Sequence, residues 1–228
     1  ELIAEKRKER NIKNVKVEGT GTNGTVKLSV PNNTTIEIYI PNNEEEKPKF
    51  DLALRSFETA MNGVAVTDRI PSVDKTKFET TENGKTITTL NYTNKKDVIK
   101  VKQNDNIEIT TRVYNEGTQD GYVSEIKGTL EDGMTFNPQD PINSKYEWKM
   151  YDADGNETSD TNNVKFIKTN YYSKEKNSQT NLIKSFDKAT MIEPNYVEVK
   201  AVITISEIKD EHRDQNIRFE IAKADGIN

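Results

Sequence analysis

The stretch with the most metal-binding character covers residues 152–156, which read Asp-Ala-Asp-Gly-Asn. Calcium takes hard oxygen ligands in proteins, so Asp152, Asp154 and Asn156 are candidate calcium ligands. An EF-type calcium loop also needs a glycine and a bidentate glutamate at two further positions, where this chain has other residues. Because Asp-Gly is typical of a hairpin turn, we favour a turn here and keep calcium as the alternative.

Nucleophilic and acid–base catalysis have few residues to build on in this sequence. Cysteine is absent, which excludes disulfides, thiolate metal sites and internal thioesters. The single histidine, His212, lies in a turn of charged residues, where a surface position is favoured over a catalytic one. Two carboxylates would suffice for a glycosidase, but no strand end gathers them with aromatic side chains. We therefore predict that the chain is not an enzyme and needs no cofactor.

Composition limits the classes of partner. The formal net charge is -5, and no basic stripe interleaves with aromatic residues, which excludes a nucleic-acid partner. No apolar run approaches the ~18 residues of a membrane span, and residues 1–4 do not begin a signal peptide. We expect a fragment of a longer protein, with any signal or anchor outside it. Hydrophobic residues make up 32% of the chain, which favours thin sheets with much solvated face over one thick core.

Alternating apolar residues divide the chain into two parts. Residues 26–30 and 36–40 alternate in the manner of strands and are separated by a Pro-Asn-Asn turn, so we expect a hairpin within a small β element. Residues 41–48 are bounded by two prolines and carry an acidic run, which is typical of a linker. We predict an N-terminal β element with its linker over residues 1–45 and a second domain over residues 46–228.

The second domain consists of short strand patterns separated by turn residues. No helical period runs through it, although residues 174–178 and 181–186 are candidates for short helices. Trp148 alternates with apolar neighbours and is predicted to face the core. The pattern predicts an all-β, antiparallel immunoglobulin-like β-sandwich preceded by the small β element. The expected strands cover residues 50–57, 86–92, 97–102, 106–114, 121–130, 146–151, 164–170, 196–205 and 216–224.

Five stretches of the second domain follow one another in a characteristic order. They are FDLALR at 50–55, RVYNEG at 112–117, DGY at 120–122, LEDGMTF at 130–136 and WKMYDADGN at 148–156. Together they resemble the conserved repeat domains of large surface proteins from clostridia and related Firmicutes, over about residues 50–200. The resemblance implies an Ig-like sandwich on the cell surface, often one unit of a stalk, and it implies no particular ligand. Gly117 and Gly133, in the turns of two of these stretches, are expected to adopt positive φ.

Relatives of this kind are often locked by an isopeptide bond between a lysine and an asparagine on facing strands, with a buried carboxylate moving the protons. The resemblance places the lysine at position 56 and the asparagine at position 217, but this chain has Ser56 and Ile217 there. Asn216 lies one residue away and would point to the other face. Glu125, the expected carboxylate, is then an ordinary strand residue. We expect no isopeptide bond.

These observations favour a non-enzymatic cell-surface structural or adhesin module, a stalk or display domain in the extracellular space or cell wall of a Gram-positive bacterium. Its expected partners are neighbouring domains of the same protein and a host protein or glycan. One alternative is a carbohydrate-binding module with Tyr171, Tyr172 and Trp148 as a stacking platform. Another is a subunit of a pilus-like or other surface polymer.

Overall fold

The chain divides into two compact units, of which the first comprises Glu1–Lys47 with Thr81–Thr86 and the second Pro48–Thr80 with Ile87–Asn228. The computed structural model describes residues 16–18, 24–30, 34–40, 48–74, 79–82, 85–88, 90–187, 190–208 and 217–227. The predicted linker boundary after residue 45 lies outside the described residues, as do His212 and Asn216. That boundary stays a prediction.

Among the described residues of Glu1–Lys47, three strands form an antiparallel sheet in the order β1-β2-β3. Its strands are β1 (Lys16–Glu18), β2 (Gly24–Val30) and β3 (Thr34–Ile40). β2 and β3 form the hairpin that the alternation predicted, with Val26 opposite Ile38 and Leu28 opposite Ile36. The register therefore places apolar positions of the two strands opposite one another.

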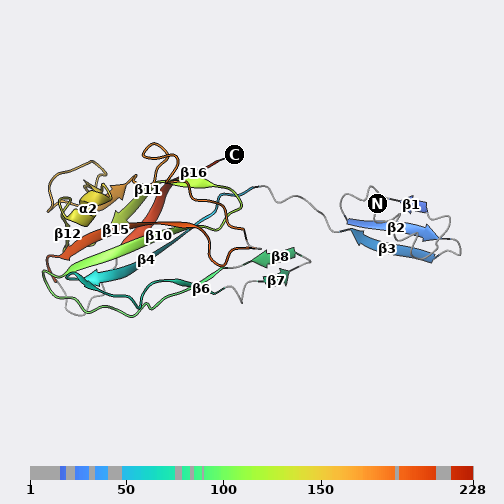
Figure 1. The fold of residues 1–228 in the computed structure, drawn as a ribbon, viewed down its shortest axis with the longest axis horizontal. Helices are drawn as coiled ribbons and strands as arrows, with labels where there is room; N and C mark the ends of the chain where they lie inside the picture. The colour runs from blue at the N-terminus through green and yellow to red at the C-terminus, as the bar shows by residue number, and fades with distance from the viewer. Residues whose placement is uncertain are drawn as a thin grey trace. The chain divides into compact units, whose positions relative to one another are not determined.

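The second unit is a β-sandwich of two antiparallel sheets (Figure 1). The larger sheet has the order β12-β15-β10-β4-β5, and the smaller has the order β13-β14-β11-β16. The larger contains β12 (Met134–Phe136), β15 (Tyr196–Ile205), β10 (Asn106–Asn115), β4 (Leu52–Met61) and β5 (Val64–Ala65). The smaller contains β13 (Lys149–Tyr151), β14 (Phe166–Thr169), β11 (Gly121–Thr129) and β16 (Arg218–Gly226). The all-β, antiparallel fold class is confirmed, and the immunoglobulin-like topology stays a prediction.

Further short elements belong to neither of these sheets. They are the paired strands β6 (Ser72–Asp74) and β9 (Asn91–Thr93), the paired strands β7 (Glu79–Glu82) and β8 (Lys85–Thr88), and helix α2 (Pro141–Lys145). The sequence analysis missed α2, which begins after the N-cap Asp140, whose carboxylate accepts a hydrogen bond from the Ile142 amide at 2.8 Å. In the part of the chain that the structure describes, no helix is long and apolar enough to cross a membrane.

The core lies between the sheets and is built by period-two alternation. In β15, every second residue from Val199 to Ile205 is buried, as expected for a strand with one face on the core. Trp148 is 4% exposed, packs edge-on against Phe219 at 6.0 Å and donates its indole N–H to the Lys200 carbonyl at 2.7 Å. The predicted burial of Trp148 is therefore confirmed, although the residue precedes β13 instead of lying within a longer strand.

Two other predictions of local structure were wrong. Residues 97–102 form no strand; Val98 is 73% exposed, and Val101 packs against the core from irregular chain. Residues 174–178 and 181–186 form turns and irregular chain instead of helices. In the first of these, the Asn177 side chain accepts hydrogen bonds from the backbone of the residues that follow it, which favours a turn over a helix.

Candidate functional site

One end of the sandwich brings together segments that are far apart in the sequence. Leu52, the first residue of β4, pairs with Asn115, the last residue of β10. Gly226, the last residue of β16, pairs with Gly121, the first residue of β11. The chain therefore comes into the sandwich and leaves it at the same end (Figure 1). Residues 116–120, which connect β10 to β11 at this end, are named the clamp loop.

The incoming segment, residues 49–51, is bonded to the clamp loop through both the amide and the carbonyl of Lys49. The Lys49 amide donates to Thr118 Oγ1 at 3.1 Å, and the Lys49 carbonyl accepts from the Gln119 amide at 3.2 Å. These bonds extend the pairing of β4 and β10 beyond the last residue of the ladder.

The outgoing segment, residues 226–227, is bonded to the other half of the same loop. The Ile227 amide donates to the Asp120 carbonyl at 2.8 Å. The side chain of Gln119 donates from Nε2 to the Ile227 carbonyl. Gln119 thus holds the incoming segment with its backbone and the outgoing segment with its side chain.

Phe50, in the incoming segment, lies against the glycines at the ends of β11 and β16. A Cβ atom built on Gly121 would lie 2.5 Å from the Phe50 ring, and one built on Gly226 would lie 2.9 Å from the Phe50 Cβ. Only glycine leaves room for the Phe50 side chain at these two positions, since real Cβ atoms do not approach so closely. The aromatic ring therefore rests on the paired ends of β11 and β16.

The two turn glycines predicted from the sequence differ in their physical role. Gly133 has a φ of +87°, as expected. Gly117 does not have positive φ, and that prediction was wrong. A Cβ atom at position 117 would lie 2.0 Å from the Lys49 carbonyl oxygen, so glycine is needed there for close approach of two backbones.

The buried side chain of Asn115 forms hydrogen bonds to the clamp loop. This side chain is fully buried, and Nδ2 donates to the carbonyls of Gln119 at 2.8 Å, Ile183 at 3.2 Å and Lys184 at 3.3 Å. Its Oδ1 accepts from the Gly117 amide at 3.0 Å. One amide side chain therefore joins the loop to the segment around residue 184.

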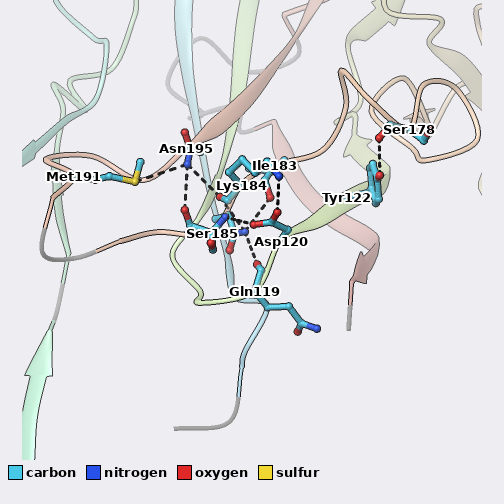
Figure 2. Close-up of polar contacts among 10 residues, drawn as sticks. Gln119, Asp120, Tyr122, Ser178, Ile183, Lys184, Ser185, Met191 and Asn195 are labelled. Carbon is cyan, nitrogen blue, oxygen red and sulfur yellow. Dashed lines mark hydrogen bonds and ion pairs between the residues drawn. The ribbon is translucent and has the colours of Figure 1, made fainter. Parts of the chain in front are cut away.

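Asp120 makes the second connection to that segment (Figure 2). Its carboxylate accepts from the Ser185 amide at 2.7 Å and pairs with Lys184 Nζ at 2.8 Å. The hydrogen bond from Lys184 lowers the pKa of Asp120 below its ordinary value. Asn195 Nδ2 in turn donates to the Ser185 carbonyl at 3.2 Å, which ties the start of β15 to the same cluster.

A second polar cluster lies on the outer face of the larger sheet, around Arg112. Its guanidinium is 9% exposed, donates from Nε to Glu198 at 2.8 Å and from Nη1 to the Tyr114 hydroxyl at 2.8 Å, and lies 4.0 Å from the Tyr196 ring centre. Glu193 approaches at 3.5 Å. The positive charge is thus neutralised within the protein, and burial raises the pKa of Tyr114 to about 12.

Tyr92 links this cluster to the clamp loop. Its ring centre lies 4.7 Å from that of Tyr114, and the Arg55 guanidinium lies over it at 4.4 Å. Its hydroxyl donates to Glu116 at 2.6 Å, and the Glu116 amide donates to the Asp51 carbonyl at 2.7 Å. Burial and the Glu116 carboxylate both raise the pKa of Tyr92. Across the described part of the chain, no buried side-chain nitrogen or oxygen lacks a hydrogen-bond partner.

The candidate calcium stretch forms a self-contained turn. Asp152 Oδ1 accepts from the amides of Asp154 at 3.0 Å and Asn156 at 2.9 Å, and Gly155 has a φ of +84°. The carboxylate that would hold an ion is therefore bonded to backbone. Within the described residues, no group of three or more histidine, cysteine or acidic side chains is arranged to hold a metal.

The presumed cross-link positions are occupied by structural contacts. Ser56 Oγ lies 3.0 Å from Thr111 Oγ1 within the larger sheet, and Ile217 packs against the core. Glu125 lies at an irregularity in the pairing of β11 with β16, and its charge contributes to the raised pKa of Tyr151, whose main cause is burial. The absence of an isopeptide bond stays a prediction.

The tyrosines considered as a sugar platform pack against the core. Tyr171 lies edge-on to the buried Tyr146 at 5.2 Å and to Tyr172 at 5.1 Å. Burial raises the pKa of Tyr172 to about 12. Rings that meet edge-on in this way do not present one flat face.

The sequence analysis described part of the clamp loop as a turn and missed its function as a junction. The tight spacing of Gly117 and Gly121 was the available signal, because both mark close backbone approach. In comparisons with known proteins, no family model matches the chain, and neither a curated protein nor a solved structure is significantly similar to it. The interpretation of this site therefore rests on its own residues.

Proposed function

We propose that this chain is a non-enzymatic structural module of a larger cell-surface protein, which displays a binding function outside a Gram-positive cell. The observation that supports this best is that buried asparagine side chains bond the backbone of loops. Asn115, Asn143 and Asn181 are at most 5% exposed, and each bonds two or more backbone groups. A side-chain amide does not titrate, so these groups fix loops and leave no proton to transfer.

The order of sequence stretches supports the surface setting. The five stretches between residues 50 and 156 stand in the order found in clostridial surface repeats, and the structure puts three of them at the junction. Residues 50–55 enter β4, residues 112–117 lead into the clamp loop, and residues 120–122 leave it. The resemblance of these stretches to surface repeats is the ground on which we place the module at a cell surface.

The alternative function, a polymer formed by strand donation, has less support, because the edge of β15 where a donated strand would pair is already bonded. Val202 is the first residue of this edge that β12 does not cover. Its amide donates to Asn143 Oδ1 at 2.7 Å, and its carbonyl accepts from Asn143 Nδ2 at 2.9 Å. Trp148 bonds the Lys200 carbonyl. These backbone groups are therefore not available to pair with a donated strand.

Immunogold electron microscopy of intact native cells tests the proposal, with an antibody raised against the purified chain. We expect gold particles on the outside of the wall, and we expect the signal to disappear when the antibody is first absorbed with the purified chain. Cytoplasmic labelling in sectioned cells, with none on intact cells, would overturn the proposal.

A further inference from the structure

The two connections of the sandwich leave from one end, and a single loop holds both of them. The clamp loop bonds Lys49 through Thr118 and Gln119, and it bonds Ile227 through Gln119 and Asp120. The rest of the sandwich extends away from this end, because β4 runs from Leu52, opposite Asn115, to Met61, opposite Ile107. A pull between the two connections therefore acts on the clamp loop first.

The order in which bonds then break follows from the strand directions. After the clamp bonds, the next pair under load is Leu52 with Asn115 in β4, or Gly226 with Gly121 in β16. Each further step loads one more pair at the same end, so the strands peel from their neighbours one residue pair at a time. A shearing pull on opposite ends of two antiparallel strands would instead load the whole ladder together.

We propose that the clamp loop is the mechanical release point of this module, and that the sandwich is a pendant display unit, not a link in a series-loaded stalk. This inference rests on the proposed function for its setting, because tension arises only where both connections belong to a larger protein. The core of the sandwich lies outside the line between the two connections and carries no load until the clamp opens.

Covalent support for the clamp is not available from side chains at this junction. The chain has no cysteine, and the clamp contacts are hydrogen bonds and the packing of Phe50 on Gly121 and Gly226. The resistance to peeling is therefore set by a small group of bonds, and changing one or two of them changes the force of release.

Single-molecule force spectroscopy of the full chain tests the proposal, with handles on introduced cysteines. Pro48→Cys with Asn228→Cys applies the pull between the two connections. Pro48→Cys with Lys102→Cys is the matched control, because Lys102 precedes β10 at the opposite end and the pull then shears β4 against β10. We expect a rupture force several-fold lower in the first geometry than in the second. Equal forces in the two geometries would overturn the proposal.

Clamp variants in the first geometry test the assignment to the loop. Thr118→Val removes the acceptor for the Lys49 amide, and Gln119→Leu removes the bond to Ile227. Both should lower the peeling force. Gln119→Leu should leave the shearing force unchanged, because the connection at Ile227 is not loaded in the second geometry. Thr204→Val is the control, since it removes a hydroxyl bond to Asn106 at the opposite end. If the peeling force is unchanged in the clamp variants, or falls equally in the Thr204 variant, release is not governed by this loop. Neither result bears on where the protein resides in the cell.

Discussion

Trp148 contacts strands of both sheets. It contacts Phe219 of β16 through its ring and the Lys200 carbonyl of β15 through its indole N–H. We expect Trp148→Ala to lower the free energy of unfolding by about 3–5 kcal/mol, because a large buried ring is replaced by a cavity. Chemical denaturation followed by circular dichroism measures the change.

A smaller substitution separates packing from hydrogen bonding at the same position. Trp148→Phe keeps an aromatic ring but leaves the Lys200 carbonyl without its donor, which should cost about 1–3 kcal/mol.

Because Trp148 is the single tryptophan, its fluorescence in the unchanged protein reports its surroundings without interference. An emission maximum typical of water in the folded protein would contradict the buried position.

Tyr114 makes stability depend on alkaline pH. Burial raises its pKa from 10.0 to about 12, so the folded state holds the hydroxyl proton more strongly than the unfolded chain does. The stabilisation is fully present below pH 10.0 and is lost as the pH rises through about 12. We expect the denaturation midpoint to fall over this range, and to fall less in Tyr114→Phe. An identical fall in the variant would exclude Tyr114 as a cause.

Position 56 is where the resemblance expects the lysine of a covalent lock, and this chain has serine there. Ser56 bonds Thr111 and offers no amine, and Ile217 offers no amide. We expect the intact mass to equal the sequence mass, whereas each Lys–Asn bond would release ammonia and lower it by about 17 Da. Ser56→Lys with Ile217→Asn, measured in parallel, shows whether the two positions are placed for the reaction. A mass deficit in the native chain would mean that another pair reacts.

At the scale of single elements, helix α2 closes the edge of β15. Asn143 is fully buried and bonds both backbone groups of Val202, as a neighbouring strand would. Asn143→Ala should leave the Val202 amide unpaired and cost about 1–3 kcal/mol, and it should expose an edge that recruits a second copy. Sedimentation at increasing concentration measures the association. Ser144→Ala, on the exposed side of α2, is the control and should remain monomeric.

A comparison of β10, β15 and α2 shows where sequence patterns succeed and fail. β10 and β15 were predicted nearly to the residue, because their apolar alternation reflects one face on the core. Helix α2 was missed because a five-residue helix is too short for a period and depends on the cap at Asp140. Residues 97–102 form no strand although Val101 packs against the core, because an apolar contact alone does not supply a pairing partner.

At the scale of the whole molecule, the junction was not predictable from local patterns. The bond from Lys49 to Thr118 joins residues 69 apart in the sequence, and that from Gln119 to Ile227 joins residues 108 apart. A glycine that permits close approach looks the same in a sequence as a glycine in a turn, which is why Gly117 was assigned the wrong role. The all-β class can be predicted once the strands are recognised. The position of the two connections can be predicted only when the strand pairing of both sheets is known.

A covalent bridge across the junction tests that position directly. A Cβ atom built on Gly226 lies 2.9 Å from the Phe50 Cβ, about 1 Å closer than in a relaxed disulfide, and the chain has no other cysteine. We expect Phe50→Cys with Gly226→Cys to oxidise to an intramolecular disulfide, seen as a loss of two hydrogens in the intact mass.

The oxidised and reduced forms of this double variant differ only in the bridge, so the lost Phe50 ring cancels from the comparison. Closing nearly the whole sandwich into one loop should stabilise the oxidised form by up to about 5 kcal/mol, because the unfolded chain loses conformational entropy. The bridge also fastens the ends of β4 and β16 together, so a pull between the two connections should no longer peel them. Reduction should restore peeling in the same molecule. If the two cysteines stay reduced under oxidising conditions while the variant remains folded, the two connections do not lie side by side.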